Sequence, residues 1–400
     1  MKPLNHVVTR TPPSGIRRFF DIAAQMEDVI SLSVGEPDFV TPWRIREAGI
    51  YAIEHGFTAY TSNIGLTRLC RAISDYLDRR YQVRYGDQEV IITVGVSEGL
   101  DLALRALLNP GDEVIFTEPC YVSYFPCISF AGGVAVPVST VGEDGFRVNA
   151  EDIEAAITPR TKAILLCYPS NPTGATQTRA DLQKVVDLAV KYDLYIISDE
   201  IYERLTYDGV HTCIASLPGA QERTILLNGF SKAYAMTGWR IGYACAPRPI
   251  ADTMLKIHQY TMLCAPHMVQ LAALEAIEHA DHDVEEMVAD YDHRRRLFVR
   301  ELNAIGMRCH EPRGAFYAFP SIARTGLTSE EFAAKLLKEQ RVAVVPGNAF
   351  GACGEGYVRC CYATSLGQLE EALERMGRFM QQFDAPQDDQ LPQKGEHVLL

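Results

Sequence analysis

The sequence lacks the features of several classes of protein. It has no apolar run of membrane-spanning length, and its start, Met1–His6, lacks the apolar stretch and cleavage site of a signal peptide. It also has no excess of positive charge: 38 basic and 51 acidic residues give a net charge of -13. That charge argues against nucleic acid or an anionic membrane as the main partner. We therefore expect a soluble, cytoplasmic protein.

Metal and nucleotide motifs are missing too. The eleven cysteines form no paired Cys-x-x-Cys or Cys/His spacing suited to zinc, so we expect reduced, mostly buried thiols. His279, His282 and Asp283 are expected at a solvated helix end, and no metal site is predicted. The sequence has no P-loop or dinucleotide fingerprint, and the glycine-rich stretch Gly347–Gly356 is expected to be a surface loop.

What the chain does contain is a repeated pattern of strands and helices. Its 400 residues, 47% of them hydrophobic, suffice for two domains with substantial cores. The apolar runs Glu113–Thr117, Thr161–Cys167 and Leu194–Ser198 predict strands covered on both faces. Arg179–Tyr192 is expected to be a helix between two of them. We therefore predict an α/β fold with a mainly parallel sheet sandwiched by helices.

The rest of the chain continues this pattern. Further strands are expected near Ile30 and at Val90–Gly95, Thr224–Leu227, Ile241–Ala246, Ala315–Phe319, Val342–Val345 and Tyr357–Tyr362. Further helices are expected at Ile16–Met26, Leu66–Tyr81, Val96–Leu108, Arg248–Leu263, His267–Ala280, Asp283–Ile305 and Ser329–Glu339, with a last one ending near Phe383. Residues 385–400 have the composition of a flexible tail.

The residues 228–242, Asn-Gly-Phe-Ser-Lys-Ala-Tyr-Ala-Met-Thr-Gly-Trp-Arg-Ile-Gly, connect two of the expected strands. Lys232, set among small and hydroxylated residues, is poorly placed to be a solvated surface charge. Partial desolvation and a nearby cation such as Arg240 would favour its neutral amine, which imine formation with an aldehyde cofactor requires. A lysine in a plain turn is the alternative.

The carboxyl ends of the expected strands carry polar and aromatic side chains. They are Pro119–Tyr124, Tyr168–Gly174 and Asp199–Tyr202, and ligands bind beyond such ends in parallel sheets. Asp199 ends an apolar strand, and a buried carboxylate is costly without a cationic partner. We therefore expect a cation beside Asp199.

Four other positions have two interpretations each. The N-terminus of the helix that begins at Val96 could bind a phosphate, although a helix cap explains Ser97 equally well. Gly35 allows a ligand close to the backbone or marks a plain turn. Tyr60 could reach a subunit interface or simply pack. Arg359 interrupts an apolar strand, so its guanidinium would bind a substrate carboxylate or a structural acidic residue.

Taken together, these residues resemble the fold-type I, pyridoxal-phosphate-dependent class I/II aminotransferases, from about Ile16 to Phe383. The resemblance rests on an ordered set: Tyr60, Gly95–Glu98, Tyr121, Asn-Pro-x-Gly at 171–174, Asp-x-x-Tyr at 199–202, Ser-Lys-x7-Arg at 231–240, and Arg359. It implies pyridoxal 5'-phosphate as cofactor and at least a homodimer. It also implies a large cofactor-binding domain at 48–285 and a smaller α+β domain formed by 1–47 and 286–384.

The resemblance implies a role for each residue. Lys232 would bind the cofactor aldehyde and move a proton between the substrate Cα and the cofactor C4′. Asp199 would pair with the pyridine nitrogen. Tyr202 and Asn171 would hydrogen-bond the phenolic oxygen, and Tyr121 would stack on the ring.

Two further groups follow from the resemblance. The phosphate would be held by Ser231, Arg240, the backbone at Val96 and Ser97, and Tyr60 of the partner subunit. The substrate and its carboxylate would be bound by Arg359, Gly35, Tyr121 and Asn171.

The substrate is less defined. Aspartate-using members of the closest subgroup carry a lysine at the position of Ser97, which disfavours aspartate here. Ser14–Ala24 and Lys256–Tyr260 are similar to aminotransferases for aromatic amino acids or acetylated diaminopimelate. We therefore expect ping-pong transfer from aromatic or other large donors to 2-oxoglutarate. An aspartate/alanine-type aminotransferase and a carbon–sulfur lyase on the same fold stay open. A DNA-binding regulator is disfavoured, because no basic helix-turn-helix segment precedes the resemblance.

Overall fold

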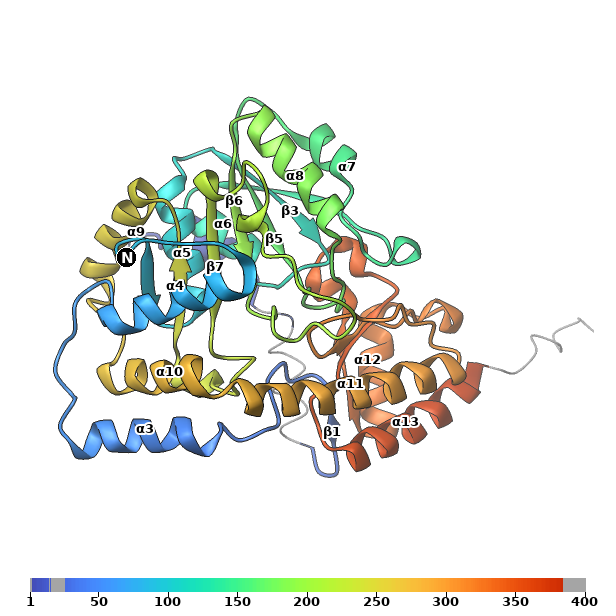
Figure 1. Ribbon diagram of the computed structural model, residues 1–400. Helices are drawn as coiled ribbons and strands as arrows, with labels where there is room; N and C mark the ends of the chain where they lie inside the picture. The colour runs from blue at the N-terminus through green and yellow to red at the C-terminus, as the bar shows by residue number, and fades with distance from the viewer. Residues whose placement is uncertain (1, 14, 16–25, 384–400) are drawn as a thin grey trace, which may run out of the picture.

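A seven-stranded sheet in the order β2-β8-β7-β6-β5-β3-β4 forms the centre of the molecule (Figure 1). The computed structural model describes residues 2–13, 15 and 26–383. Neighbouring strands are parallel except at β8, which is antiparallel to β2 and β7. The strands are β2 Val90–Thr93, β3 Glu113–Glu118, β4 Val134–Ser139, β5 Thr161–Cys167, β6 Tyr195–Asp199, β7 Thr224–Gly229 and β8 Gly242–Cys245. The predicted α/β fold with a mainly parallel sheet is confirmed.

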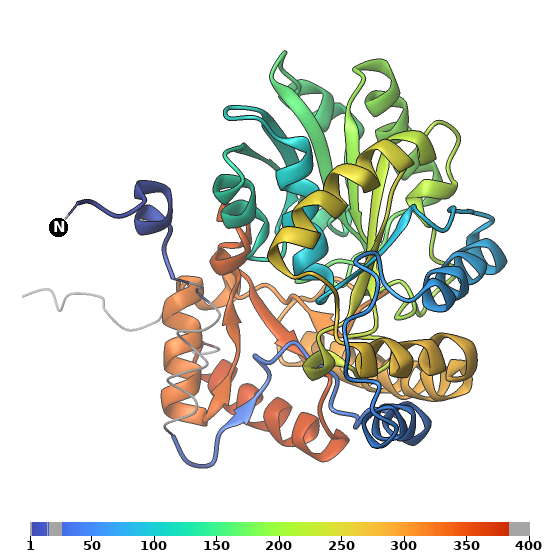
Figure 2. The same cartoon turned by 90° about the vertical axis from the view of Figure 1, so that its left-hand side faces the viewer.

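The C-terminal part of the chain forms two small sheets. β9 (Tyr317–Ala318), β12 (Val358–Cys361) and β11 (Val345–Pro346) pair in antiparallel fashion. β1 (Ile30–Ser31) pairs in parallel with β10 (Val342–Ala343), so an N-terminal segment lies among C-terminal elements (Figure 2). The long helices here are α11 Asp281–Ala304, α12 Ser329–Gln340 and α13 Leu366–Met380. The domain limits expected from the sequence stay a prediction, and α11 runs continuously through residue 285.

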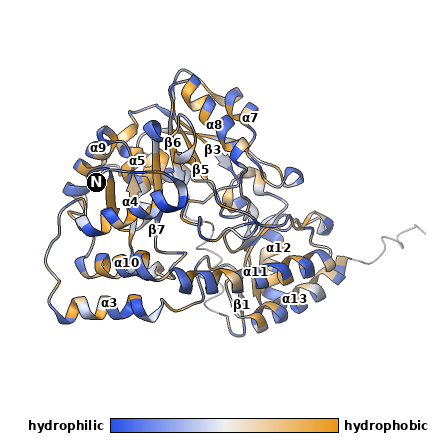
Figure 3. Cartoon of the chain, in the orientation of Figure 1, coloured by the Kyte–Doolittle hydropathy of each residue, from blue (hydrophilic) through white to orange (hydrophobic). Residues whose placement is uncertain are grey.

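Successive residues along a strand of the large sheet belong to different apolar clusters, one on each face of the sheet. On β5, Leu165 packs on the face covered by α5 (Val96–Leu107). Its neighbour Leu166 packs on the opposite face with α8 (Arg179–Lys191). Because side chains alternate across a strand, a strand buried on both faces appears as a continuous apolar run. In Figure 3 the sheet is mostly in the hydrophobic colour, while the outer helices carry both colours.

The other helices around the sheet include both expected and unexpected elements. Expected from the apolar periodicity are α4 Thr67–Tyr81, α9 Arg248–Thr261 and α10 His267–His279. The strand β4 and four helices were not predicted: α1 His6–Arg10, α3 Trp43–Glu54, α6 Tyr124–Phe130 and α7 Ala150–Ala156. β4 is an edge strand with half its residues facing solvent, and α3 buries only Ile45, Gly49 and Ala52. Their apolar pattern is therefore weak.

Two expectations fall outside the described residues, namely most of the helix at Ile16–Met26 and the tail at 385–400. Among the helices that the structure does describe, none is both long and apolar enough to cross a lipid bilayer.

Candidate active site

A cavity of about 1090 Å³ opens where β3, β5, β6 and β7 end and the sheet β11-β12-β9 faces them. Eleven of the twelve residues proposed from the sequence line this one cavity: Gly35, Val96, Ser97, Tyr121, Asn171, Asp199, Tyr202, Ser231, Lys232, Arg240 and Arg359. Tyr60 does not line it, and its side chain is 82% exposed. The structure thus brings together segments separated by more than 300 positions in the chain.

Lys232 lies in the turn that follows β7, with its amine in the cavity. Its Nζ donates a hydrogen bond to the carbonyl oxygen of Gly35 at 2.8 Å. Burial lowers the pKa of Lys232 to about 8, and the cations Arg359 and Arg240 act in the same direction. About a tenth of this amine is therefore neutral at pH 7 and about half at pH 8, and the neutral form is able to attack a carbonyl carbon.

Asp199 is the last residue of β6, and its carboxylate is buried. Oδ2 accepts a hydrogen bond from the Tyr124 hydroxyl at 2.8 Å, and Oδ1 accepts one from the backbone N–H of Ile201 at 3.2 Å. Burial raises the pKa of Asp199 to about 6, although the bond from Tyr124 opposes the shift. Both hydrogen-bond partners are neutral, so a cationic group in the cavity would restore the charged carboxylate.

An anion cradle lies at the N-terminus of α5. Gly95 has φ of +79°, and a Cβ there would lie 2.7 Å from Nη2 of Arg240. Gly242 is equally confined, because its Cβ would lie 2.8 Å from the backbone nitrogen of Val96. These two glycines allow a guanidinium and the first N–H groups of a helix to approach each other. Together with the hydroxyl of Ser231 in the same cavity, they suit a phosphate.

Arg359 on β12 is the cation on the wall of the cavity opposite the end of the large sheet, and it is only 2% exposed. Nη1 donates to Oδ1 of Asn171 at 3.0 Å, and Nη2 donates to the carbonyl oxygen of Ser33 at 2.6 Å. Its Nε, also buried, has no hydrogen-bond partner among the described residues. The guanidinium lies 4.6 Å from the ring centroid of Tyr317 and 4.9 Å from that of Phe350. A buried cation held only by neutral oxygens and rings suits an incoming carboxylate.

Three side chains of this site were missed by the sequence analysis. Tyr124, the partner of Asp199, lies in the stretch 119–124 that was expected at a strand end, but no pattern singled it out. The Tyr317 hydroxyl lies 2.8 Å from the hydroxyl of Tyr202. Phe350 belongs to the stretch 347–356, expected to be a surface loop: Asn348, Ala352 and Glu355 are exposed, but Phe350 is buried and lines the cavity. The stretch packs against the cavity, since a Cβ on Gly351 would lie 2.4 Å from the carboxyl carbon of Glu118.

The fold and the cavity together define a class of enzyme. A neutral amine suits an aldehyde, a buried carboxylate suits a protonated pyridine, and the cradle at α5 suits a phosphate. These are the three groups of pyridoxal 5'-phosphate, and they lie at the carboxyl edge of a mainly parallel sheet. This arrangement is that of the fold-type I enzymes that use this cofactor.

Comparison with known proteins gives the family. The model for aminotransferase class I and II matches residues 27–376. A putative aminotransferase, YugH, from Bacillus subtilis is 56% identical over 94% of this chain and 98% of its own length. An aspartate aminotransferase from Pyrococcus abyssi is 46% identical over 92% of this chain and 96% of its own. The crystal structure of an aromatic aminotransferase from Pyrococcus horikoshii superposes with a TM-score of 0.88 at 44% identity, covering 92% of this chain and 99% of that one.

The chain therefore belongs to the class I and II aminotransferases. It is a pyridoxal-phosphate-dependent enzyme that acts on an amino acid and a 2-oxo acid.

Proposed function

We propose that the protein transfers amino groups from aromatic or other large amino acids to 2-oxoglutarate by a ping-pong mechanism. The proposed choice of amino donor rests on the charges of the side chains that line the cavity. Among the described residues, the cations that line the cavity are Lys232, Arg240 and Arg359, and each already has a proposed task. Much of the remaining wall is apolar or aromatic, formed by Pro12, Pro13, Tyr121, Val122, Phe125, Pro126, Phe130, Tyr317 and Phe350.

An acidic side chain on the donor would find no further cation among the described residues that line the cavity. The carboxylates of Glu36 and Glu118 also line the cavity, and an additional buried negative charge without a cation is costly. Ser97 offers only a hydroxyl, and by the family resemblance aspartate-using members of the subgroup are expected to carry a lysine at this position. A flat apolar side chain can instead pack on the aromatic wall. The acceptor 2-oxoglutarate is proposed from the family resemblance alone, since its distal carboxylate would also find no further cation among the described lining residues.

The residues on the cofactor side would act as follows. Pyridoxal 5'-phosphate, when bound, supplies a conjugated ring that withdraws electrons from the substrate Cα. Asp199 would hold a proton on the pyridine nitrogen, and the Tyr202 hydroxyl and the Asn171 amide would donate hydrogen bonds to the phenolic oxygen. Tyr121 would pack on the ring face. Lys232 would first hold the aldehyde and then, released by the substrate amine, move a proton from Cα through its own Nζ.

Two groups would position the reactants. The phosphate would be held by Ser231, Arg240 and the N–H groups of Val96 and Ser97. The substrate carboxylate would bind the fork of Arg359, with Gly35 and Asn171 beside it. With the cofactor phosphate and the substrate carboxylate both held, the Cα–H bond would lie within reach of Lys232. This orientation would lower the barrier to proton transfer.

The test is a set of half-reactions. Single amino acids are added to the cofactor-loaded protein without an acceptor, and the absorbance of the bound cofactor is followed. We expect phenylalanine and tyrosine to convert it to the pyridoxamine form faster than aspartate does, and 2-oxoglutarate to reverse the conversion. Faster conversion by aspartate would overturn the proposed donor in favour of an aspartate-type enzyme. Release of a thiol, ammonia and a keto acid from a sulfur-containing amino acid such as cystathionine, without conversion of the cofactor, would indicate a carbon–sulfur lyase.

We also propose a homodimer in which Tyr60 completes the phosphate cradle of the partner subunit. The support is an exposed apolar surface on α3 and the loop after it, formed by Trp43, Ile50, Tyr51, Ile53, Phe57 and Tyr60. Such a surface on a monomer is typical of an interface. Light scattering after gel filtration tests the dimer. A monomeric, fully active protein would contradict it. The cytoplasmic location stays a prediction from the sequence.

A further inference from the structure

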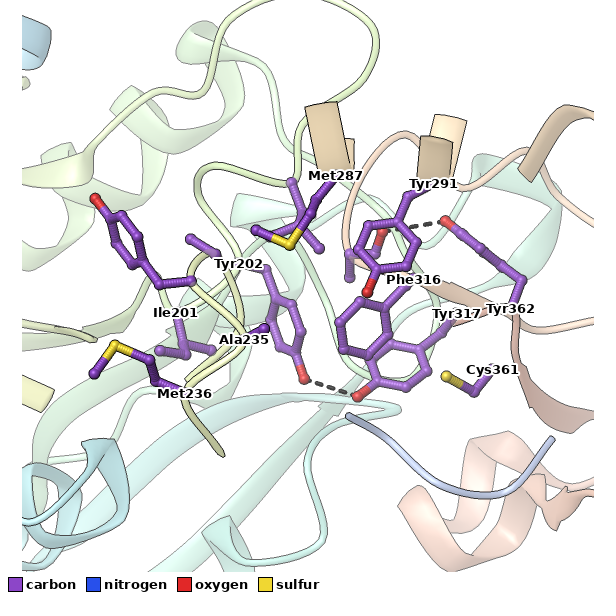
Figure 4. Close-up of a cluster of buried hydrophobic side chains, with 14 of the residues drawn as sticks. Ile201, Tyr202, Ala235, Met236, Met287, Tyr291, Phe316, Tyr317, Cys361 and Tyr362 are labelled. Atoms are coloured by element: carbon purple, nitrogen blue, oxygen red, sulfur yellow. Dashed lines mark hydrogen bonds between the residues drawn. The ribbon is translucent and has the colours of Figure 1, made fainter. Parts of the chain in front are cut away.

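The side chain of Tyr317 contacts Tyr202, Gly35 and Arg359 together. Its hydroxyl lies 2.8 Å from the Tyr202 hydroxyl and 3.4 Å from the carbonyl oxygen of Gly35. Its ring lies under the guanidinium of Arg359, 4.6 Å from ring centroid to Cζ. Figure 4 shows the hydroxyls of Tyr202 and Tyr317 pointing toward each other.

Tyr317 lies where the small sheet that contains β9 faces the large sheet. It lies on β9, where it is paired with Cys361 of β12, the strand that carries Arg359. Tyr202, in contrast, follows β6 of the large sheet. The hydrogen bond between the two tyrosines therefore joins the wall proposed to bind the cofactor to the wall proposed to bind the substrate carboxylate. Gly35 is confined by the same hydroxyl, because a Cβ there would lie 2.5 Å from it.

The count of protons decides what Tyr317 does. Each tyrosine hydroxyl has a single proton to donate. If Tyr202 donates its proton to the phenolic oxygen of the cofactor, it has none left for Tyr317. Tyr317 then donates its proton to the Tyr202 oxygen at 2.8 Å and not to the Gly35 carbonyl at 3.4 Å. That carbonyl already accepts a hydrogen bond from Nζ of Lys232 at 2.8 Å. A hydroxyl that accepts one hydrogen bond becomes a stronger donor in the next.

We propose that Tyr317 is a positioning residue with two separate functions. Its hydroxyl donates to Tyr202 and so directs the Tyr202 proton at the phenolic oxygen of the cofactor. Its ring holds the plane of the Arg359 guanidinium for the substrate carboxylate. The inference rests on the proposed roles of Tyr202 and Arg359.

The experiment measures the pH midpoint of the absorbance change of the bound cofactor, in four variants of the full-length protein. A donor on the phenolic oxygen favours the deprotonated form of the cofactor linkage, in which that oxygen bears more negative charge. Loss of the donor in Tyr202→Phe therefore raises the midpoint, by about one pH unit. Tyr317→Phe should raise the midpoint by about 0.3 pH unit, because Tyr202 keeps its hydrogen bond to the phenolic oxygen and loses only the strengthening of that bond by Tyr317. The double variant should match Tyr202→Phe alone.

Tyr362→Phe is the matched control. Tyr362 is another buried tyrosine of this cluster, and its hydroxyl donates to the carbonyl oxygen of Ala315 at 3.1 Å, away from Tyr202 (Figure 4). Its midpoint should equal that of the unmodified protein. A shift as large as that of Tyr317→Phe would mean that general loosening of the core causes both, and would overturn the inference.

Other outcomes separate the inference from the proposed function. No shift in Tyr202→Phe would overturn the contact of Tyr202 with the cofactor and the inference with it. A shift in Tyr202→Phe but none in Tyr317→Phe would overturn the inference alone. So would an additional shift from Tyr317→Phe in the Tyr202→Phe background.

The function of the Tyr317 ring is tested by comparing KM for the amino acid in two variants, Tyr317→Phe and Tyr317→Leu. Tyr317→Phe keeps the ring under Arg359, so its KM for the amino acid should stay within about twofold. Tyr317→Leu removes the ring and should raise KM by about 5-fold or more, as expected for a lost cation–π contact in a desolvated site. Equal KM values in the two variants would contradict the function assigned to the ring.

Discussion

The two walls of the active site are built in different ways. On the proposed cofactor wall, Asp199 ends a strand of the large parallel sheet and Lys232 follows another, so the sheet edge brings them together. On the carboxylate wall, Arg359 comes from a small sheet and is bonded to Ser33 and Asn171, residues distant in the sequence. The first wall depends on regular topology, the second on individual long-range contacts.

The difference also concerns charge. Asp199 is a buried carboxylate with neutral partners, and Arg359 is a buried guanidinium with neutral partners. Each wall therefore holds a charge that a ligand would complement: the cofactor on one side and the substrate on the other. If the comparison is right, substitutions on the first wall alter the binding and absorbance of the cofactor. Substitutions on the second wall mainly alter the use of substrate, and Tyr317, whose hydroxyl bonds Tyr202 of the first wall, is the exception.

The largest effect is expected for Lys232→Ala. Loss of the amine removes both the covalent attachment of the cofactor and the proton transfer, so kcat should fall by at least about 10⁴-fold. The variant should still bind the cofactor non-covalently, because the cradle at Arg240 is intact. Steady-state assays and absorbance spectra measure both. Near-normal turnover would contradict the roles assigned to Lys232 on the cofactor wall.

Next in size is Arg359→Lys, on the second wall. A lysine keeps the charge but loses the forked pair of donors. Loss of a charged hydrogen bond should lower kcat/KM by about 10- to 150-fold. The affinity for the cofactor should fall far less than kcat/KM, because the groups proposed to bind the phosphate and the pyridine nitrogen are intact. An affinity for the cofactor that falls as much as kcat/KM would show that the two walls are not separate.

A change in stability is expected for Asp199→Asn in the cofactor-free protein. Burial raises the pKa of Asp199 from 3.8 to about 6 in the folded state. A raised pKa stabilises the fold fully below the unfolded value, near pH 4, and this contribution is lost as the pH rises through 6. At pH 8 the ionised carboxylate therefore costs about 3 kcal/mol. Asparagine avoids this cost.

Urea unfolding at pH 4 and pH 8 measures this effect. The asparagine variant should be more stable than the unmodified apoprotein at pH 8, and the difference should shrink at pH 4. Its affinity for the cofactor should fall, because the pyridinium loses its counter-charge. Lower stability at pH 8 would contradict the assigned cost of burying Asp199.

The smallest effect is expected for Tyr124→Phe. The variant removes one donor to Asp199, so the pKa of that carboxyl should rise further and the cofactor should bind about 10-fold more weakly. Tyr168→Phe serves as control, because the hydroxyl of this buried tyrosine bonds Thr117 and not Asp199. The dissociation constant of the cofactor, measured by fluorescence, checks both. Equal constants in the two variants would contradict a specific role for Tyr124.

The parts that could be predicted from the sequence are those fixed by local pattern. Apolar runs predicted the parallel strands and the polar residues at their carboxyl ends, Asp199 among them. That Lys232 shares a site with Asp199 was predicted from the family resemblance. β4 was missed because an edge strand is half exposed. α3 was missed because few of its side chains are buried in this single chain.

Contacts between distant segments could not be predicted in this way. Tyr124 and Asp199 are 75 positions apart, and Tyr202 and Tyr317 are 115 apart. No periodicity links such pairs, and tyrosine fits a core as well as a site. Among the described residues, the cation expected beside Asp199 is likewise not a direct hydrogen-bond partner. We propose that the cofactor supplies that charge.

The most direct measurement of the central claim is chemical reduction of the cofactor-loaded protein with borohydride, followed by peptide mass mapping. Reduction converts a lysine–aldehyde linkage into a stable amine. We predict the added cofactor mass on the peptide that contains Lys232, and no labelled lysine in Lys232→Ala. Label on a different lysine, or bound cofactor that cannot be fixed to any lysine, would contradict the account.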